Sequence, residues 1–251
     1  MSEVAHEHPV LRVATWNIHK GVQGLGPARR LEIHNIGHAI EQLDADLVCL
    51  QEVRLVNRRE QKRFLRWPEQ SQAEFLAPEG YEPVYRTNAV TRHGEHGNAL
   101  LSRWPVLSHQ HEDMSDHRFE QRGLLHTEVV VAGRAVHVLV VHLGLIPASR
   151  ERQVMQLRRY IERQVPHGVP VIVAGDFNDW GTRLTLLLGR GGLRQCEGAS
   201  TPTYPSRLPL AQLDHVYARG LRPLSTLVPR GRIWRQMSDH LPLVAEFALQ
   251  D

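Results

Sequence analysis

Eight short apolar runs, rich in valine, isoleucine and leucine, constrain the fold of this chain more than any other feature of its sequence. They occupy residues 11–16, 46–50, 99–102, 124–131, 134–141, 169–174, 213–217 and 241–248. Each run is bounded by turn residues and is too short for a typical helix, which is the composition expected of a buried strand. The two runs on either side of Ala132 and Gly133 are typical of a β-hairpin with a tight turn.

Two segments between these runs have apolar residues at helical spacing. One covers residues 28–43, and the other follows Pro147, with Ser149 as a candidate N-cap and apolar residues at Val154, Leu157, Ile161 and Val165. Strands and helices thus alternate in both halves of the chain, and no linker rich in proline, serine or glycine separates the halves. We therefore expect an α/β fold with helices outside its sheets, formed by one domain over residues 1–251.

The composition excludes several other classes of protein. The chain has 251 residues, of which 41% are hydrophobic, so a sizeable core is available. No apolar stretch approaches the roughly 18 residues that span a bilayer, and the first residues lack a signal-peptide pattern, so we expect no transmembrane segment and a cytoplasmic location. Cys49 and Cys196 form neither a CxxC motif nor a disulfide framework, which excludes a zinc finger and a disulfide-stapled secreted domain.

The basic residues are almost all arginine, although the formal net charge is only +3. The planar guanidinium group suits bidentate recognition of phosphate, but a genome rich in arginine codons would also produce this bias. Two basic and partly aromatic segments, residues 54–67 and 222–235, could each face a polyanion. The alternatives are a solvated helix face for the first segment and an irregular loop for the second.

Polar residues capable of metal or proton chemistry stand at the ends of five apolar runs. In chain order they are Asn17, Gln51 with Glu52, His142, Asp176 with Asn178, and the pair Asp239 and His240 that precedes the last run. In α/β folds, ligands gather outside strand ends, where loops converge over a rigid sheet. Each residue taken alone also fits an ordinary turn, cap or surface position. Their joint placement predicts one site.

The residue types in this set favour phosphate-ester hydrolysis. Oxygen ligands such as Asn17, Glu52 and Asp239, without cysteine, suit a hard cation such as Mg²⁺. Asp176 and Asn178 could orient a water molecule from one turn. The histidines at 142 and 240 could pair with phosphate oxygens or move protons near neutral pH.

Seven segments resemble the motifs of the endonuclease/exonuclease/phosphatase superfamily, in the family's order and over nearly the whole chain. They are TWNIHKG (15–21), LQEVR (50–54), GNALLSRWPV (97–106), VVHLGL (140–145), AGDFND (174–179), QLDHVY (212–217) and SDHLPLV (238–244). The resemblance implies a four-layer α/β sandwich like that of DNase I, with two packed mixed β-sheets flanked by helices. It also implies that the site lies at one end of the sandwich.

The resemblance also implies a role for each matching residue. Asn17 and Glu52 match the metal-binding motifs, and Asp239 is a further metal contact, for Mg²⁺ with Mn²⁺ as a substitute. Asp176 and Asn178 match the groups that position water and phosphate. Asp214 and His240 match a carboxylate–histidine pair, in which the carboxylate fixes the tautomer of the imidazole. His142 stands where the DNase I and sphingomyelinase branches have a histidine. Arg122 is a candidate phosphate clamp, and Asn98 a candidate support for His142 at the substrate.

The expected function is a Mg²⁺-dependent phosphodiesterase that acts on nucleic acid or a phospholipid head group by in-line attack of water. The alternatives are a phosphomonoesterase acting on a sugar or inositol phosphate and a catalytically inactive scaffold of the same fold. Either His240 or Asp176 could be the base. The segments TWNIHKG and QLDHVY depart from the AP endonuclease and inositol phosphatase signatures, which favours a bacterial branch near DNase I with His19, Lys20 and His215 as its own features. The natural substrate and the oligomeric state stay open.

Overall fold

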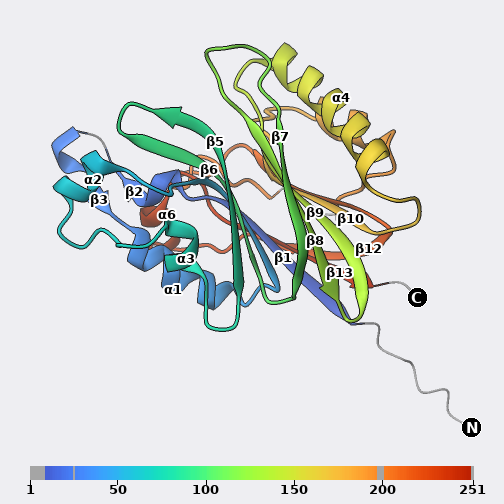
Figure 1. Ribbon diagram of the computed structural model, residues 1–251, viewed down its shortest axis with the longest axis horizontal. Helices are drawn as coiled ribbons and strands as arrows, with labels where there is room; N and C mark the ends of the chain where they lie inside the picture. The colour runs from blue at the N-terminus through green and yellow to red at the C-terminus, as the bar shows by residue number, and fades with distance from the viewer. Residues whose placement is uncertain (1–8, 25, 197–200, 250–251) are drawn as a thin grey trace, which may run out of the picture.

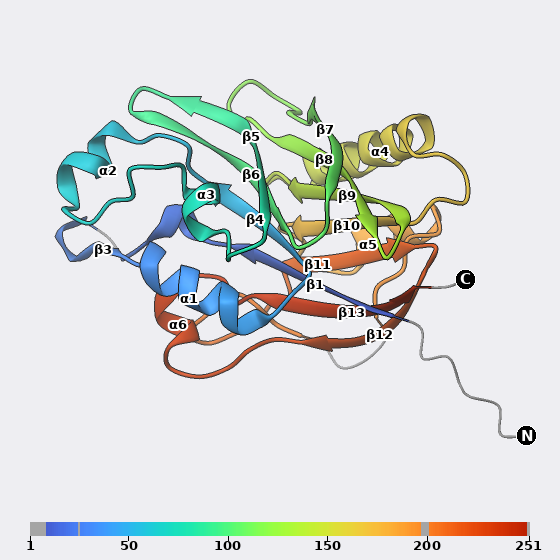
Figure 2. The ribbon, with the colours of Figure 1, turned by 60° about the horizontal axis from the view of Figure 1, so that its bottom comes forward.

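Two large mixed β-sheets pack face to face in the computed structural model, which describes residues 9–24, 26–196 and 201–249 (Figure 1). The six-stranded sheet has the order β12 (Leu221–Leu227), β13 (Leu243–Leu249), β1 (Val10–Asn17), β4 (Leu47–Val53), β6 (Gly94–Ser102) and β5 (Glu82–Thr91). Figure 2 follows this order from β5 at the top to β12 at the bottom. The five-stranded sheet has the order β11 (Asp214–Arg219), β10 (Val171–Asp176), β9 (Arg134–His142), β8 (Gly123–Val131) and β7 (Val106–Asp113). A small hairpin joins β2 (Val22–Gln23) to β3 (Arg30–Leu31).

Helices cover the outer faces of both sheets, which confirms the four-layer sandwich. The six-stranded sheet carries α1 (Ile33–Leu43), α3 (Gln72–Leu76) and α6 (Trp234–Met237), while α4 (Pro147–Gln164) and α5 (Arg183–Gly189) cover the five-stranded sheet (Figures 1 and 2). The short α2 (Arg58–Arg63) and the 3-10 turns η1 (His19–Gly21) and η2 (Gly26–Ala28) lie in the connections. α1 is held to its sheet by a stripe of buried residues that includes Ile33, Ile36 and Ile40.

The central strands are buried on both faces, which explains why they appear in the sequence as continuous apolar runs. In β1, Leu11 and Val13 point between the two sheets, whereas Ala14 and Trp16 point toward the helices. Because both sides of such a strand lie in a core, the polar alternation of a surface strand is lost. All eight predicted strands are present, and the turn at Ala132 and Gly133 has the positive φ angles, 49° and 83°, of a tight hairpin.

Three further strands of the two large sheets, β5, β7 and β12, had no apolar run to predict them, and neither had the two-residue strands β2 and β3. Each lies at an edge of its sheet, and most side chains of β7 and β12 are exposed or only partly buried. An edge strand with one solvated face has a polar sequence. The alternative of an irregular loop over residues 222–235 is therefore wrong in part, because most of β12 and the start of α6 lie in this segment.

Two helix boundaries also differ from the sequence prediction. The helix expected from residue 28 begins at Ile33, because η2 and β3 occupy the preceding residues. Ser149 is not an N-cap: Ile146 is the cap residue, and Pro147 begins the helix. The Ser149 hydroxyl instead donates to Asp116 Oδ2 at 2.6 Å, which ties α4 to the loop before β8.

Both cysteines are buried free thiols, and burial raises the pKa of each. They therefore stay protonated and take no part in a disulfide. Among the described residues, none of the helices combines the length and the apolar character needed to cross a membrane.

Candidate active site

Strand register brings four of the predicted site residues to one end of the sandwich. In the five-stranded sheet, Asp176 is in register with His142 on one side and with Asp214 on the other, so three polar residues lie in a row across β9, β10 and β11. Asn17, at the end of β1, reaches this row from the six-stranded sheet: its Nδ2 donates to Asp176 Oδ2 at 3.0 Å. The site therefore lies where the ends of the two sheets meet.

Asp176 is the centre of this group and is almost completely buried. Besides Asn17, the backbone N–H of Asn178 donates to its Oδ1 at 2.9 Å. Its Oδ2 lies 3.5 Å from His142 Nε2 and 3.6 Å from His240 Nε2. Burial raises the pKa of Asp176 to about 6, although the positive charge of His240 acts in the opposite direction. A carboxylate with that pKa and a fixed orientation can accept a proton near neutral pH.

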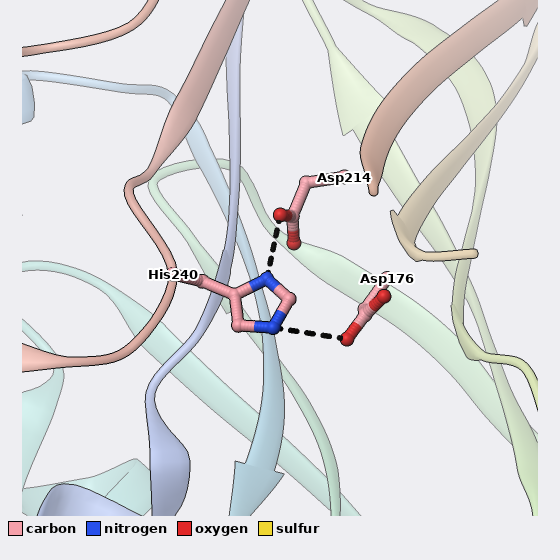
Figure 3. A group of neighbouring side chains, drawn as sticks. All are labelled: Asp176, Asp214 and His240. Carbon is pink, nitrogen blue, oxygen red and sulfur yellow. Dashed lines mark hydrogen bonds and ion pairs between the residues drawn. The ribbon is translucent and has the colours of Figure 1, made fainter. Parts of the chain in front are cut away.

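His240 joins Asp176 to Asp214 (Figure 3). Its Nδ1 donates to Asp214 Oδ2 at 2.8 Å, and the same oxygen accepts from Thr203 Oγ1 at 2.6 Å. Burial opposes the charged form of His240, but Asp214 and Asp176 outweigh it and raise its pKa to about 10. His240 is therefore an imidazolium at neutral pH, with the N–H at Nε2 directed toward Asp176.

His142, unlike His240, is neutral. Burial and the neighbouring Arg122 charge hold the pKa of His142 well below its ordinary value, so its ring is neutral. Asp176 Oδ2 thus lies between a neutral and a charged imidazole. Titratable groups whose environments drive their pKa values apart are a mark of acid–base sites.

A second group of charges surrounds Glu52. This residue lies in a bulge of β4, where the pairing with β6 shifts register, and its φ of 57° is unusual for a residue with a side chain. Lys20 Nζ lies 2.9 Å from Glu52 Oε2. His19 Nδ1 lies 3.9 Å from the same oxygen and 3.4 Å from Asp239 Oδ2. Burial opposes ionisation of Glu52, but the ammonium group of Lys20 lowers its pKa far below the ordinary range, so it is a carboxylate.

The oxygen atoms around Glu52 fit a hard divalent cation. Glu52 and Asp239 flank the same His19 nitrogen, and Asn17 contacts the backbone of this histidine, its Oδ1 accepting from the His19 N–H at 3.0 Å. Asp176, Asp214 and His240 also offer three ligand atoms within 4.8 Å of one another. Protonated His240 has no nitrogen lone pair to offer a metal, however, so the Glu52 group is the better candidate for Mg²⁺ or Mn²⁺.

Asn98, Arg122 and Asn178 make mainly supporting contacts. The Asn98 amide donates to the carbonyls of Gly123 and Val140 at 2.9 and 3.0 Å, which joins β6 to the opposite sheet beneath the site. Arg122 pairs with Glu120 at 2.9 Å and keeps its charge close to His142. The Asn178 amide donates to the Leu143 carbonyl at 2.9 Å, which ties the loop after β10 to the loop after β9.

Sequence reasoning missed Thr203 and Tyr204. Thr203 donates a second hydrogen bond to Asp214 Oδ2, and the Tyr204 ring lies 4.8 Å from the His240 ring. The exposed Trp180 packs edge-on against Tyr204 at 6.0 Å and so extends this aromatic surface outward. Both missed residues belong to an irregular loop without an apolar run. The only sequence signal for this part of the site is Thr203, because a threonine hydroxyl can donate a hydrogen bond to a nearby carboxylate.

Gly175 holds Asp176 at the correct depth. A Cβ at this position would collide with the Val141 carbonyl oxygen of β9. Gly175→Ala is expected to displace the end of β10 and to lower turnover by about 10²-fold, because small misplacements of a catalytic group are costly. Turnover and thermal unfolding measured together test this, with Gly189→Ala as control, since a Cβ there meets nothing within 4 Å. Equal turnover in the two variants would contradict the argument.

Comparison with known sequences matches most of the chain to one family. A model of the Endonuclease/Exonuclease/phosphatase family matches residues 14–240. The uncharacterized protein YbhP of Escherichia coli K12 is 37% identical over 246 residues, which cover 95% of this chain and 96% of that protein. A UPF0294 protein of Yersinia enterocolitica is 29% identical over 243 residues, which cover 94% of this chain and 83% of that protein.

Solved structures with the same fold are more distant in sequence. An endonuclease/exonuclease/phosphatase from Beutenbergia cavernae has a TM-score of 0.77 at 22% identity and covers 96% of this chain and 72% of its own. A mannosyl-6-phosphatase from Bacteroides thetaiotaomicron has a TM-score of 0.74 at 18% identity, and the match covers 95% of this chain and 100% of that protein. The human Nocturnin catalytic domain has a TM-score of 0.72 at 20% identity, and the match covers 97% of this chain and 96% of that domain. These similarities establish the four-layer fold.

Proposed function

The chain belongs to the endonuclease/exonuclease/phosphatase family of phosphohydrolases, and on that basis we propose that it hydrolyses a phosphodiester with the help of Mg²⁺. The observation that carries this proposal is the pair of imidazoles, one neutral and one charged, on either side of Asp176 Oδ2. A base and cationic donors within one buried group are what in-line displacement at phosphorus needs. We treat residues 1–251 as one catalytic unit.

The water-attack side of the reaction is assigned to Asp176 and His240. Asp176 orients the water and accepts its proton, and the Asn17 amide fixes the orientation of that carboxylate. The imidazolium of His240 binds a phosphoryl oxygen through Nε2, while Asp214 holds the proton on Nδ1. This assignment chooses Asp176 as the base, because a histidine with a pKa near 10 is already protonated at neutral pH.

The leaving-group side is assigned to His142 and the Glu52 group. His142 would hydrogen-bond the phosphate opposite His240, and the charge of Arg122 beside it would favour an anionic ligand. Glu52, Asp239 and Asn17 would hold the cation. When bound, the cation polarises the phosphoryl oxygens and stabilises charge on the leaving oxygen.

The test compares a diester and a monoester of nitrophenyl phosphate, each with Mg²⁺, with Mn²⁺ and with chelator. We expect diester turnover that needs Mg²⁺, is retained with Mn²⁺ and is lost with chelator. Faster turnover of the monoester would support a phosphomonoesterase acting on a sugar or inositol phosphate instead. The absence of turnover of both esters, together with the absence of metal binding by calorimetry, would indicate a binding scaffold.

The Glu52→Gln variant tests the cation site itself. Removing the charge of this carboxylate is expected to weaken Mg²⁺ binding by at least tenfold, as measured by titration calorimetry in the absence of substrate. Glu128→Gln in β8, whose carboxylate accepts from Ser108 at 3.2 Å, serves as the matched control. Equal Mg²⁺ affinity in the two variants would remove Glu52 from the proposed ligand set.

A further inference from the structure

Two adjoining hollows, which we call the arginine groove, are lined by residues of the β2–β3 hairpin, of α6 with the turn before it, and by Arg207. Their volumes are about 450 and 810 Å³. Arg30 and Arg207 line both, so the two hollows form one continuous groove. Arg29 joins the lining at one end, and Arg232 and Arg235 at the other.

The groove concentrates positive charge without acidic neighbours in its lining. All its lining residues belong to the described part of the chain, and they include five arginines and no carboxylate. Arg29 is paired with Glu60 at 2.6 Å and Arg30 with Glu32 at 3.3 Å. The structure gives Arg207, Arg232 and Arg235 no ion-pair partner among the described residues, and all three are exposed. Like charges gathered in a hollow repel one another, so the groove is suited to an anion.

Hydrogen bonds connect the groove to the active site. The backbone N–H of Ser206 donates to the Asp239 carbonyl at 2.7 Å, and its hydroxyl donates to the Ser238 carbonyl, also at 2.7 Å. Arg207 follows Ser206 directly, and Arg235 precedes Ser238 by one short turn in α6. The groove therefore begins beside the segment that carries Asp239 and His240.

We propose that the arginine groove binds the phosphate backbone of a single nucleic-acid strand, one of whose phosphodiesters lies at Asp176 and His240. This inference rests on the proposed function, whose substrate class it specifies. A strand presents regularly spaced phosphates, and each exposed guanidinium can bind one of them as a bidentate fork. The concave shape favours a strand over a bilayer, because a flat membrane surface cannot follow a groove.

The experiment measures binding without turnover. A fluorescent oligothymidylate of roughly a dozen nucleotides is titrated with the protein in the presence of chelator, at several salt concentrations. The double variant Arg207→Gln/Arg235→Gln is expected to bind at least about tenfold more weakly. The slope of log K against log salt should also become shallower, by roughly 0.7 for each arginine removed.

Arg159→Gln is the matched control, because Arg159 is exposed on α4, at the opposite side of the sandwich. It should bind the oligonucleotide like the unmodified protein, and thermal unfolding of all variants verifies that they are folded. Unchanged affinity and salt slope in the double variant would overturn the proposal. The proposal would also be overturned if the protein sedimented with phosphatidylserine vesicles but did not bind the oligonucleotide. That result would assign the groove to a membrane surface. Since the assay needs no catalysis, failure of diester hydrolysis with intact groove binding would contradict the proposed function alone.

Discussion

Replacing Asp176 with asparagine is expected to lower kcat for a phosphodiester by about 10³-fold or more. The amide is nearly the same size as the carboxylate, but it cannot accept the proton of the attacking water. The substitution also removes one of the two negative charges that face His240. Because the carboxylate is buried with a raised pKa, its neutral replacement should leave the fold intact and should not lower thermal stability at neutral pH.

Asp179→Asn provides the matched control for this variant. Asp179 is buried in the same loop, but its carboxylate accepts only backbone N–H groups, those of Gly181 and Leu184, at 3.2 and 3.3 Å. These bonds go to Oδ1 and Oδ2 respectively, so an asparagine keeps one of the two. Since neither bond involves a residue of the candidate site, turnover should be kept. Steady-state kinetics with the nitrophenyl diester compares the two variants. A folded Asp176→Asn protein that retains turnover would refute the assignment of Asp176 as the base.

Replacing His240 with glutamine is expected to reduce both turnover and stability. Turnover should fall by about 10³-fold, because the cationic donor to the phosphoryl group is lost. Stability should fall by about 3 kcal/mol at neutral pH, because Asp214 and Asp176 are left buried without their shared cation. The matched control is His126→Gln, a buried histidine beneath α4 that bonds His137 and Tyr160 and should keep full turnover.

The stability loss of His240→Gln should depend on pH. The pKa of His240 is raised in the folded state to about 10, so its stabilising contribution is complete below the ordinary value of 6.5 and is lost as the pH rises through 10. Urea unfolding of the chelated protein at pH 7 and pH 10 should therefore show a smaller difference between the unmodified protein and the variant at pH 10. A difference that grows with pH would mean that His240 is neutral in the folded protein.

The central part of the fold could be predicted from the sequence because its strands are buried on both faces. Such strands, β10 for example, leave a continuous apolar run that identifies them. The edge strands could not be predicted in this way, since the exposed residues of β7 are as polar as those of a loop. Short helices such as α2 depend on local capping, here by Asn57, and have too few residues to show a period.

The site residues could be proposed because most of them stand directly at strand ends. The structure brings Asn17, His142, Asp176, Asp214 and His240 into direct contact, as strand register and the family motifs suggested. Two kinds of residue escaped detection. Thr203 and Tyr204 reach the site from an irregular loop, and the groove arginines come from three separate segments. Only their positions in space, which single-sequence patterns do not encode, bring them together.

The order of strands in the six-stranded sheet also affects when the site can form. β1, the first strand, lies between β4 and β13, and Val10 is paired with Ala248. A chain emerging from the ribosome therefore holds an open edge on β1 until β13 has been made. His240 lies just before β13, so the candidate site cannot assemble before this part of the chain has been made. The residues that meet at Asp176 are therefore brought together only by a folding step that follows the synthesis of residue 240.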